Sequence, residues 1–318
     1  MLSGLTKRYR VRKGHSFRLA DIDPADTAGL RLEKDEAQAL IAAGVEQLNR
    51  LQGRLYAEHQ WALLIILQGM DAAGKDGVVK HVMSGVNPLG CSAHSFKAPS
   101  QQELDHDYLW RHHVVMPRRG HIGIFNRSYY EEVLVVRVHK ELLAAEGLPP
   151  KLLHEDIWNQ RFEEISAYER YLARNGIIPL KFFLHLSKEE QRRRLLERAD
   201  DPEKQWKFSM SDLADRQLWD QYMAAYEDTI RQTASKQAPW HVVPADNKWF
   251  TRLVVASTIV ETLEKLDPKP PKIDPEAKAE LTKAREALLA EPSTAAAIPP
   301  RVLTAQHGPG RKNPPGNG

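Results

Sequence analysis

The stretch that most constrains this chain is Trp61–Gly77, WALLIILQGMDAAGKDG. Its first seven residues, Trp61–Leu67, are an uninterrupted apolar run. The run is too short to cross a membrane and has the length of a strand that is covered on both faces. A glycine-rich turn and a helical pattern follow. The stretch therefore predicts a buried strand that leads through a tight turn into a helix.

The turn matches most of the phosphate-binding pattern G-x-x-x-x-G-K-[ST], the P-loop. Gly69 and Gly74 bracket four residues and precede Lys75. Backbone N–H groups without Cβ crowding, together with the positive end of the next helix, form an anion site, and Lys75 adds a point charge. A glycine-rich solvated turn is the alternative, which the strand–loop–helix context and the spacing disfavour. The loop residues expected around a phosphate are Gly69, Ala72, Ala73, Gly74, Asp76 and Gly77.

Two positions of the loop depart from the common pattern. Asp76 stands where Ser or Thr would place a hydroxyl on magnesium, and Asp71 places a carboxylate inside the loop. These substitutions suggest a P-loop kinase with an unusual division of labour among its side chains.

Composition sets the outer limits. The 318 residues fit one large domain or one domain with additions, and the formal net charge of +3 is too small to argue for nucleic acid. The only cysteine, Cys91, excludes an internal disulfide and favours a reducing compartment. The basic N-terminus lacks the apolar core of a secretory signal, and no run reaches the ~20 apolar residues of a membrane span. We expect a soluble cytoplasmic protein without nucleic-acid or membrane partners.

The remaining chain predicts an alternation of strands and helices. Further strands are expected at 92–97, 121–125, 177–186 and 240–245. Helices are expected at 32–59, 75–84, 100–113, 151–174, 213–235 and 247–266, with a short one near 275–290. Capping boxes are expected at Ser100–Glu103, Ser128–Glu131 and Ser187–Glu190.

This alternation suggests three parts. Residues 1–59 form an N-terminal extension and helix, 60–268 a core, and 269–318 a proline-rich tail whose end is expected to be disordered. The helix at 32–59 is expected to pack beside the core or to support an oligomer contact.

Two basic residues are expected at the ends of strands. Lys97 and the helix that follows it lie at the carboxyl end of a strand, where doubly wound sheets bind ligands. Arg127 follows Asn126 at the end of 121–125, where many P-loop proteins carry a magnesium-binding carboxylate. The planar fork of Arg127 favours a position facing a phosphate, and pairing with an acidic neighbour is the alternative.

A basic segment occupies 188–215. Arg192, Arg193, Arg194 and Arg198 fall within seven residues and cover more than one face of a helix. We expect a mobile lid that closes arginines over a polyanionic substrate. A charged surface helix is the alternative.

With these features placed, the chain resembles the polyphosphate kinase 2 family. The resemblance is carried in the expected order by GMDAAGKDG (69–77), FKAPS (96–100), DYLWR (107–111), IFNRSYYEEVLV (124–135), DPEKQWKFSMSD (201–212) and APWHVVPADNKWFTR (238–252). It implies a three-layer α/β/α P-loop kinase fold, similar to thymidylate kinases, with a parallel central sheet and a helical lid.

The resemblance also implies the chemistry: reversible transfer of a phosphoryl group between inorganic polyphosphate and a nucleotide, with Mg²⁺ or alternatively Mn²⁺. Asp71 would bind the metal, and Asp71, Lys75 and Arg127 would be catalytic. Asn126, where many members have Asp, resembles the subgroup that accepts both AMP and ADP, so ATP would be a product. A homo-oligomer, dimer or tetramer, is expected. The implied phosphate or nucleotide contacts outside the P-loop are Lys97, Asn126, Arg194, Arg198 and Lys207.

Two rival functions stay open. An ATP-dependent nucleoside monophosphate kinase of the same fold would carry Ser or Thr after Lys75, and Asp76 argues against it. A non-catalytic polyanion-binding protein would use Arg192–Arg194 and the basic tail, but it gives Asp71 no purpose.

Overall fold

The computed structural model describes residues 4–291, apart from the side chain of Lys34. The chain divides into two compact units, Met1–Pro271 and Lys272–Gly318. In its described part the second unit holds one helix, α13 (Pro275–Ala290), which begins at an Asp274 cap followed by proline. This helix was expected. The expected disordered end lies, from residue 292 onward, outside the described residues.

A six-stranded sheet runs through the first unit in the order β1-β6-β5-β2-β4-β3. All neighbouring pairs from β6 to β3 are parallel. The α/β expectation is confirmed, with one correction: the sheet is not wholly parallel, because the two-residue β1 pairs antiparallel with β6 at the edge. The strands are β1 (Arg10–Val11), β2 (Ala62–Gln68), β3 (Cys91–Ser95), β4 (Ile122–Asn126), β5 (Ile177–His185) and β6 (Trp240–Pro244).

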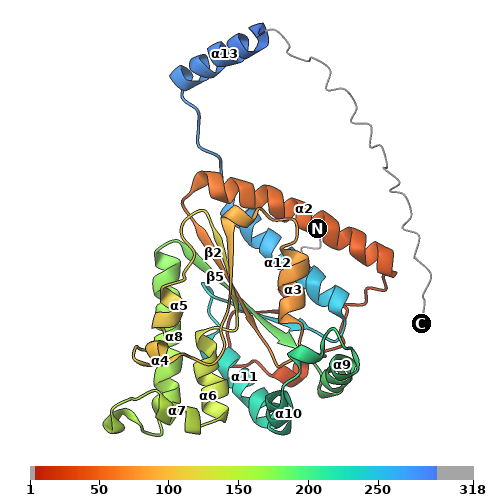
Figure 1. Ribbon diagram of the computed structural model, residues 1–318, viewed down its shortest axis with the longest axis vertical. Helices are drawn as coiled ribbons and strands as arrows, with labels where there is room; N and C mark the ends of the chain where they lie inside the picture. Colours follow the sequence, from red (N-terminus) through yellow and green to blue (C-terminus); the bar gives the residue numbers. More distant parts are fainter. Residues whose placement is uncertain (1–3, 292–318) are drawn as a thin grey trace, which may run out of the picture. The chain divides into compact units, whose positions relative to one another are not determined.

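Two layers of helices cover the sheet, and β2 shows why (Figure 1). Successive side chains of a strand point to opposite faces. Leu63, Ile65 and Leu67 join one apolar cluster, with α2 (Lys34–Glu58), α3 (Lys75–Val82) and α12 (Lys248–Leu266). Leu64 and Ile66 join the other, with α8 (Ile157–Arg174) and α11 (Trp219–Thr233). The three-layer prediction is confirmed.

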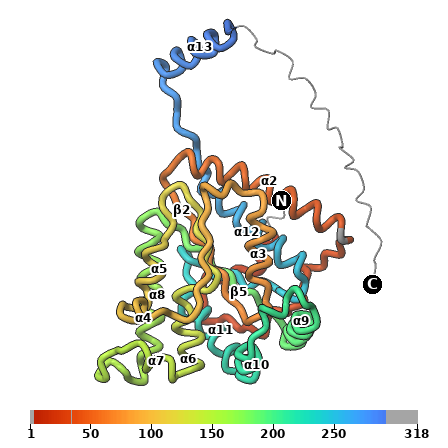
Figure 2. The backbone as a smooth tube through the Cα atoms, in the orientation of Figure 1, coloured from red at the N-terminus to blue at the C-terminus, as the bar shows by residue number. Residues whose placement is uncertain are grey.

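Shorter elements complete the chain. The remaining α-helices are α1 (Leu5–Arg8), α4 (Gln101–Leu104), α5 (Trp110–His113), α6 (Val135–Val138), α7 (Glu141–Ala145), α9 (Lys188–Asp200) and α10 (Met210–Gln217). The 3-10 helices are η1 (Leu19–Asp21), η2 (Pro88–Gly90), η3 (Tyr129–Val133), η4 (Pro150–Leu152) and η5 (Gln205–Lys207). Figure 2 traces the backbone through them, with α9 directly after β5.

Three helix predictions need correction. The helix expected at 100–113 is two short ones, α4 and α5, and the helix expected at 213–235 is broken between α10 and α11. The helix expected at 151–174 begins at Ile157, so Leu152 lies before it and is 45% exposed instead of packed in the core. Apolar spacing marked the buried faces correctly but could not locate these breaks.

One of the three capping boxes forms as expected. Ser100 and Glu103 cap each other's backbone reciprocally. Ser187 accepts a hydrogen bond from the Glu190 N–H, but the Glu190 carboxylate turns to Arg193 and Arg194 instead of returning it. Ser128 caps the Tyr130 N–H, while Glu131 binds Arg127. In both places the carboxylate pairs with arginine instead, which adds a full positive charge and more than one N–H donor to what a single backbone N–H offers.

A buried ion pair lies between the sheet and the helices α8 and α11 that cover one of its faces. The Lys181 side chain is fully buried, and its Nζ donates to Glu169 Oε2 at 2.6 Å, to the Tyr130 hydroxyl at 2.9 Å and to the Thr233 carbonyl at 2.9 Å. The other oxygen of Glu169 accepts hydrogen bonds from Tyr129 and Tyr130. The pair thus ties β5 to α8 and to η3.

Two carboxylates that share one arginine predict that the stability of the fold depends on pH. Glu132 and Glu146 share Arg161, at 3.0 and 3.6 Å. Burial and the charge of Glu132 raise the pKa of Glu146 to about 8. A carboxyl whose pKa is higher in the fold than in the unfolded chain stabilises the fold when protonated. This contribution is fully present below the ordinary glutamate pKa of 4.5, declines as the pH rises from there, and is lost above about 8.

We therefore expect the Tm to fall between about pH 5 and pH 8, and Glu146→Gln to remove part of that fall because glutamine does not ionise. Thermal unfolding followed by circular dichroism at several pH values measures both. The same pH profile in wild type and variant would contradict a titrating Glu146.

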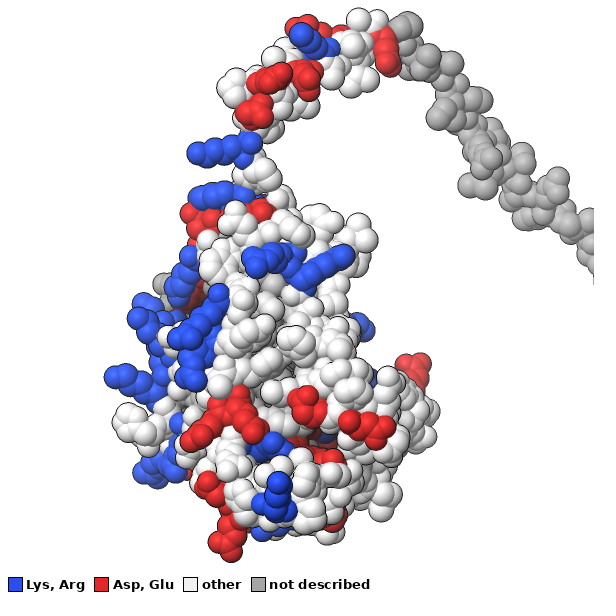
Figure 3. Space-filling view, turned by 90° about the vertical axis from the view of Figure 1, so that its left-hand side faces the viewer, with Lys and Arg blue, Asp and Glu red and all other residues white. Residues whose placement is uncertain are grey.

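Charge is local on the surface. On the face shown in Figure 3, lysine and arginine side chains gather along one side and carboxylates gather lower down. Within residues 4–291, no helix has the length and apolar character needed to cross a membrane.

Candidate active site

The site lies where the parallel strands end. The loop after β2, Asn126 at the end of β4 with Arg127 directly after it, and α9 after β5 all lie at the same edge of the sheet, where the parallel strands end. Because strands of a parallel sheet point one way, residues far apart in sequence meet at this edge.

The P-loop has the backbone that its glycines predict. Gly69 has φ +154° and Gly74 has φ +103°, and a Cβ on Gly69 would lie 2.9 Å from the Leu184 carbonyl oxygen. Glycine is therefore required at position 69 by the close approach of β5. Ala72 adopts φ 65° without that freedom, a strained conformation of the kind that concentrates at functional sites.

Lys75 is buried and points back into the loop, where Nζ donates to the Gly69 carbonyl at 2.6 Å and to the Met70 carbonyl at 3.2 Å. Burial and the charge of Arg127 lower the pKa of Lys75, while the carboxylates of Asp71 and Glu131 oppose this shift.

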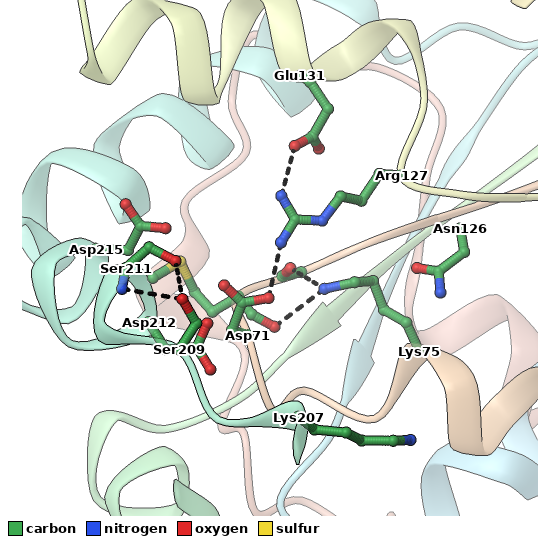
Figure 4. A network of polar contacts seen from close by, with 12 residues as sticks. Asp71, Lys75, Asn126, Arg127, Glu131, Lys207, Ser209, Ser211, Asp212 and Asp215 are labelled. Atoms are coloured by element: carbon green, nitrogen blue, oxygen red, sulfur yellow. Dashed lines mark hydrogen bonds and ion pairs between the residues drawn. The ribbon is translucent and has the colours of Figure 1, made fainter. Parts of the chain in front are cut away.

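Arg127 stands at the end of β4 in a left-handed conformation, φ 64°. Its guanidinium donates to Asp71 Oδ1 at 2.7 Å and to Glu131 Oε2 at 3.0 Å (Figure 4). Glu131, and Asp71 to a smaller degree, raise the pKa of Arg127 against the effect of burial. The structure thus contains the acidic pairing that was the alternative for Arg127, and one of its two partners is the proposed catalytic carboxylate.

The pKa of Asp71 is shifted the other way, towards lower values. Burial disfavours its charge, but Lys75 and Arg127 outweigh burial and lower the pKa of the carboxyl. Asp212, at the start of α10, lies within hydrogen-bonding reach of Asp71, and burial together with Asp71 raises the pKa of Asp212 to about 6. Arg198 donates to Asp212 at 2.9 Å. Asp71, Lys75 and Arg127 therefore come together as the sequence predicted, with Arg198 linked to them through Asp212.

Asp76 and Asn126, the two unusual positions, touch each other. Asn126 Nδ2 donates to Asp76 Oδ1 at 2.6 Å, and Lys207 Nζ lies 3.6 Å from Asp76 Oδ2. The side chain that replaces Ser or Thr thus links the end of β4 to η5. Lys97 is exposed two residues beyond β3.

Arg194 points away from solvent into the back of the P-loop. Its NH1 donates to the carbonyls of Ala72 and Ala73, and its NH2 to those of Ala245 and Asp246. Arg192 and Arg193 are exposed and pair with glutamates of their own helix. For these two residues the structure agrees with the charged-surface alternative.

Three contributors were missed as site residues: Glu131, Asp212 and Asp246. Glu131 was assigned only to a cap. Asp246 accepts a hydrogen bond from the Ser187 N–H at 2.8 Å and lies two residues beyond the end of β6, a position that could have marked it. Asp212 ends the motif DPEKQWKFSMSD (201–212), but the motif alone assigns it no role, and it lies beside Asp71 through the fold of the segment between α9 and α10.

The geometry suits a phosphate-binding loop, and the residues present fit a magnesium ion. Carboxylate oxygens are the ligands that Mg²⁺ prefers, and it commonly takes one or two of them with substrate phosphates and water. Asp71 and its neighbour Asp212 provide such oxygens. Residues 4–291 contain no group of three or more His, Cys, Asp or Glu that could hold a metal by itself.

Comparison with known proteins gives consistent results. The family model described as polyphosphate kinase 2 matches residues 31–271. An ADP-polyphosphate phosphotransferase of Rhodopseudomonas palustris is 48% identical over 285 residues, covering 89% of this chain and 98% of that protein. An AMP/ADP-polyphosphate phosphotransferase of Meiothermus ruber is 48% identical over 260 residues, covering 82% and 93%. The crystal structure of polyphosphate kinase 2 from Arthrobacter aurescens TC1 superimposes with a TM-score of 0.81 at 39% identity, covering 89% and 96%.

Proposed function

The chain belongs to the polyphosphate kinase 2 family, and from this we propose that it transfers the terminal phosphoryl group of inorganic polyphosphate to AMP and to ADP, giving ADP and ATP. The observation that supports this most is the convergence of Asp71, Lys75 and Arg127 at the P-loop. The first step forms a bond from a phosphate oxygen of the nucleotide to the terminal phosphorus of polyphosphate. The phosphoanhydride bond to the rest of the chain breaks, and the shortened polyphosphate leaves.

Each side chain has a separate task. The P-loop N–H groups hold phosphoryl oxygens, and Lys75 turns from the loop carbonyls to follow the transferred group. Arg127, fixed between Asp71 and Glu131, offsets charge on the equatorial oxygens. Arg198 of α9 and Lys207 of η5 add positive charge beside Asp212 and Asp76, where they offset charge on the bound phosphates.

Asp71 is the proposed Mg²⁺ ligand and orients the acceptor oxygen. Mg²⁺, with Mn²⁺ as the alternative, would neutralise part of the charge of the bound phosphates. The remaining work of the protein is positioning and charge neutralisation. We propose that the protein acts in the cytoplasm as a homo-oligomer.

The acceptor range is tested by incubating the protein with AMP, long-chain polyphosphate and Mg²⁺ in the absence of ATP. We expect ADP to appear first and ATP after it. If only added ADP is phosphorylated, the assignment of Asn126 to the dual-acceptor subgroup is wrong. If turnover needs ATP as the donor, the protein is an ordinary monophosphate kinase. Binding of polyphosphate without turnover would favour the polyanion-binding alternative.

A further inference from the structure

The helix α9 sends two buried side chains to the back of the P-loop. Gln191, with no exposed surface, donates from Nε2 to the Asp71 carbonyl at 3.1 Å. Arg194, 6% exposed, donates from NH1 to the Ala72 carbonyl at 3.0 Å and to the Ala73 carbonyl at 3.2 Å. Three consecutive carbonyls of the loop are therefore bound from one helix, 120 to 122 residues further along the chain.

Arg194 has no donor left for a substrate. A guanidinium carries five N–H donors. Besides the two bonds to the loop, Nε donates to Glu190 at 2.7 Å, and NH2 donates to the carbonyls of Ala245 and Asp246 at 2.6 and 3.0 Å. These five bonds use the whole fork, so a phosphate contact would require breaking one of them.

The bound carbonyls determine where the loop's N–H groups point. A trans peptide unit is planar, so the N–H of each residue points opposite to the carbonyl of the residue before it. With the carbonyls of Asp71 and Ala73 drawn towards α9, the N–H groups of Ala72 and Gly74 face away from α9. The Ala73 N–H is held inside the loop by the Met70 carbonyl at 3.1 Å. Lys75 occupies the carbonyls of Gly69 and Met70.

We propose that Gln191 and Arg194 are positioning residues that fix the P-loop backbone from behind and aim its amides at the phosphate, and that α9 does not move with the lid. The lid expected at 188–215 then begins beyond the end of α9 at Asp200, with the segment that carries η5 and α10. The kinetic part of this inference rests on the proposed function, whereas the structural part does not.

Two variants distinguish residues that position the P-loop backbone from residues that bind phosphate directly. Gln191→Glu replaces the donor to the Asp71 carbonyl by an oxygen but keeps the acceptor that Arg216 uses at 3.0 Å. Arg194→Lys keeps the charge but ends in one ammonium, which cannot reach both pairs of carbonyls. Arg192→Ala is the matched control, because Arg192 lies on the same helix, is exposed and pairs only with Glu189 among the described residues.

The first readout is hydrogen–deuterium exchange of peptides covering 69–77, without nucleotide or phosphate. We expect both variants to exchange about tenfold faster or more in this segment, and Arg192→Ala to match wild type. A phosphate ligand would leave the substrate-free loop unchanged. Wild-type exchange in both variants would therefore overturn the proposal, whether or not the enzyme turns over polyphosphate.

The second readout is the split between kcat and KM. Misplaced amides are expected to lower kcat by about 10²-fold, with a smaller change in the KM for polyphosphate. A raised KM at wild-type kcat in Arg194→Lys would identify Arg194 as a phosphate contact and overturn the proposal. If Arg194→Lys does not fold, Gln191→Glu decides alone. No turnover by wild type in any donor–acceptor pair would contradict the proposed function and leave the exchange result standing.

Discussion

Replacing Arg127 by alanine is expected to lower kcat/KM for polyphosphate-driven phosphorylation of AMP by about 10³-fold, the size seen when a transition-state arginine is removed. The physical reason is the double pairing of Arg127 with Asp71 and Glu131. Without the guanidinium, two carboxylates face an anionic substrate with less opposing charge. Initial rates of ADP formation at varied polyphosphate give the value.

Backbone strain must be separated from the loss of the side chain, because Arg127 has φ 64°. Arg127→Gly removes the same guanidinium but suits a positive φ. Equal losses in the two variants would assign the effect to the side chain. Arg127→Lys keeps the charge without the fork and is expected to recover only part of the rate. A fall of less than about tenfold in Arg127→Ala would remove Arg127 from the site.

Replacing Lys181 by alanine is expected to lower the free energy of unfolding by about 3–5 kcal/mol. Lys181 is fully buried, and its partner Glu169 is 2% exposed. Removing the lysine leaves a buried carboxylate whose remaining hydrogen bonds within residues 4–291 come from the hydroxyls of Tyr129 and Tyr130. Urea unfolding followed by tryptophan fluorescence measures the change.

A double variant tests whether the unpaired charge causes the loss. Lys181→Met fills the space without a charge, and Glu169→Gln keeps an acceptor for the two tyrosines. We expect the double variant to recover at least half of the stability that Lys181→Met alone loses. A single Lys181→Met variant that costs less than about 1 kcal/mol would contradict a buried ion pair.

The features that the sequence predicted were those with a local or periodic signal. The apolar run 61–67 predicted β2, and the pattern after it the start of α3, to within one residue of the observed bounds, because a buried strand and a tight turn leave few alternatives. Long amphipathic helices such as α2 and α12 were also placed correctly to within two residues. The two residues of β1 carry no pattern at all, and only pairing with β6 makes them a strand.

The direction of side chains was the harder part. Four arginines in seven residues indicated a charged helix, but only the fold shows that Arg194 points inward while Arg192 and Arg193 face solvent. Lys181 could have been suspected from the sequence, because a lysine inside the apolar strand IIPLKFFLH must find a buried partner. Its partner Glu169 carries a similar signal, because it falls on the helical spacing of Phe162, Ile165 and Leu172, the buried stripe of α8.

The contact between Asn126 and Asp76 has a consequence for any redesign of the proposed acceptor site. At 2.6 Å, the amide of Asn126 is a hydrogen-bond donor to a carboxylate. Restoring aspartate at position 126 would place two anions in contact, so that change has to be made together with one at position 76 or supplied with a bridging cation. Positions 76 and 126 therefore have to be redesigned together, because the pair as it stands carries one negative charge, that of Asp76.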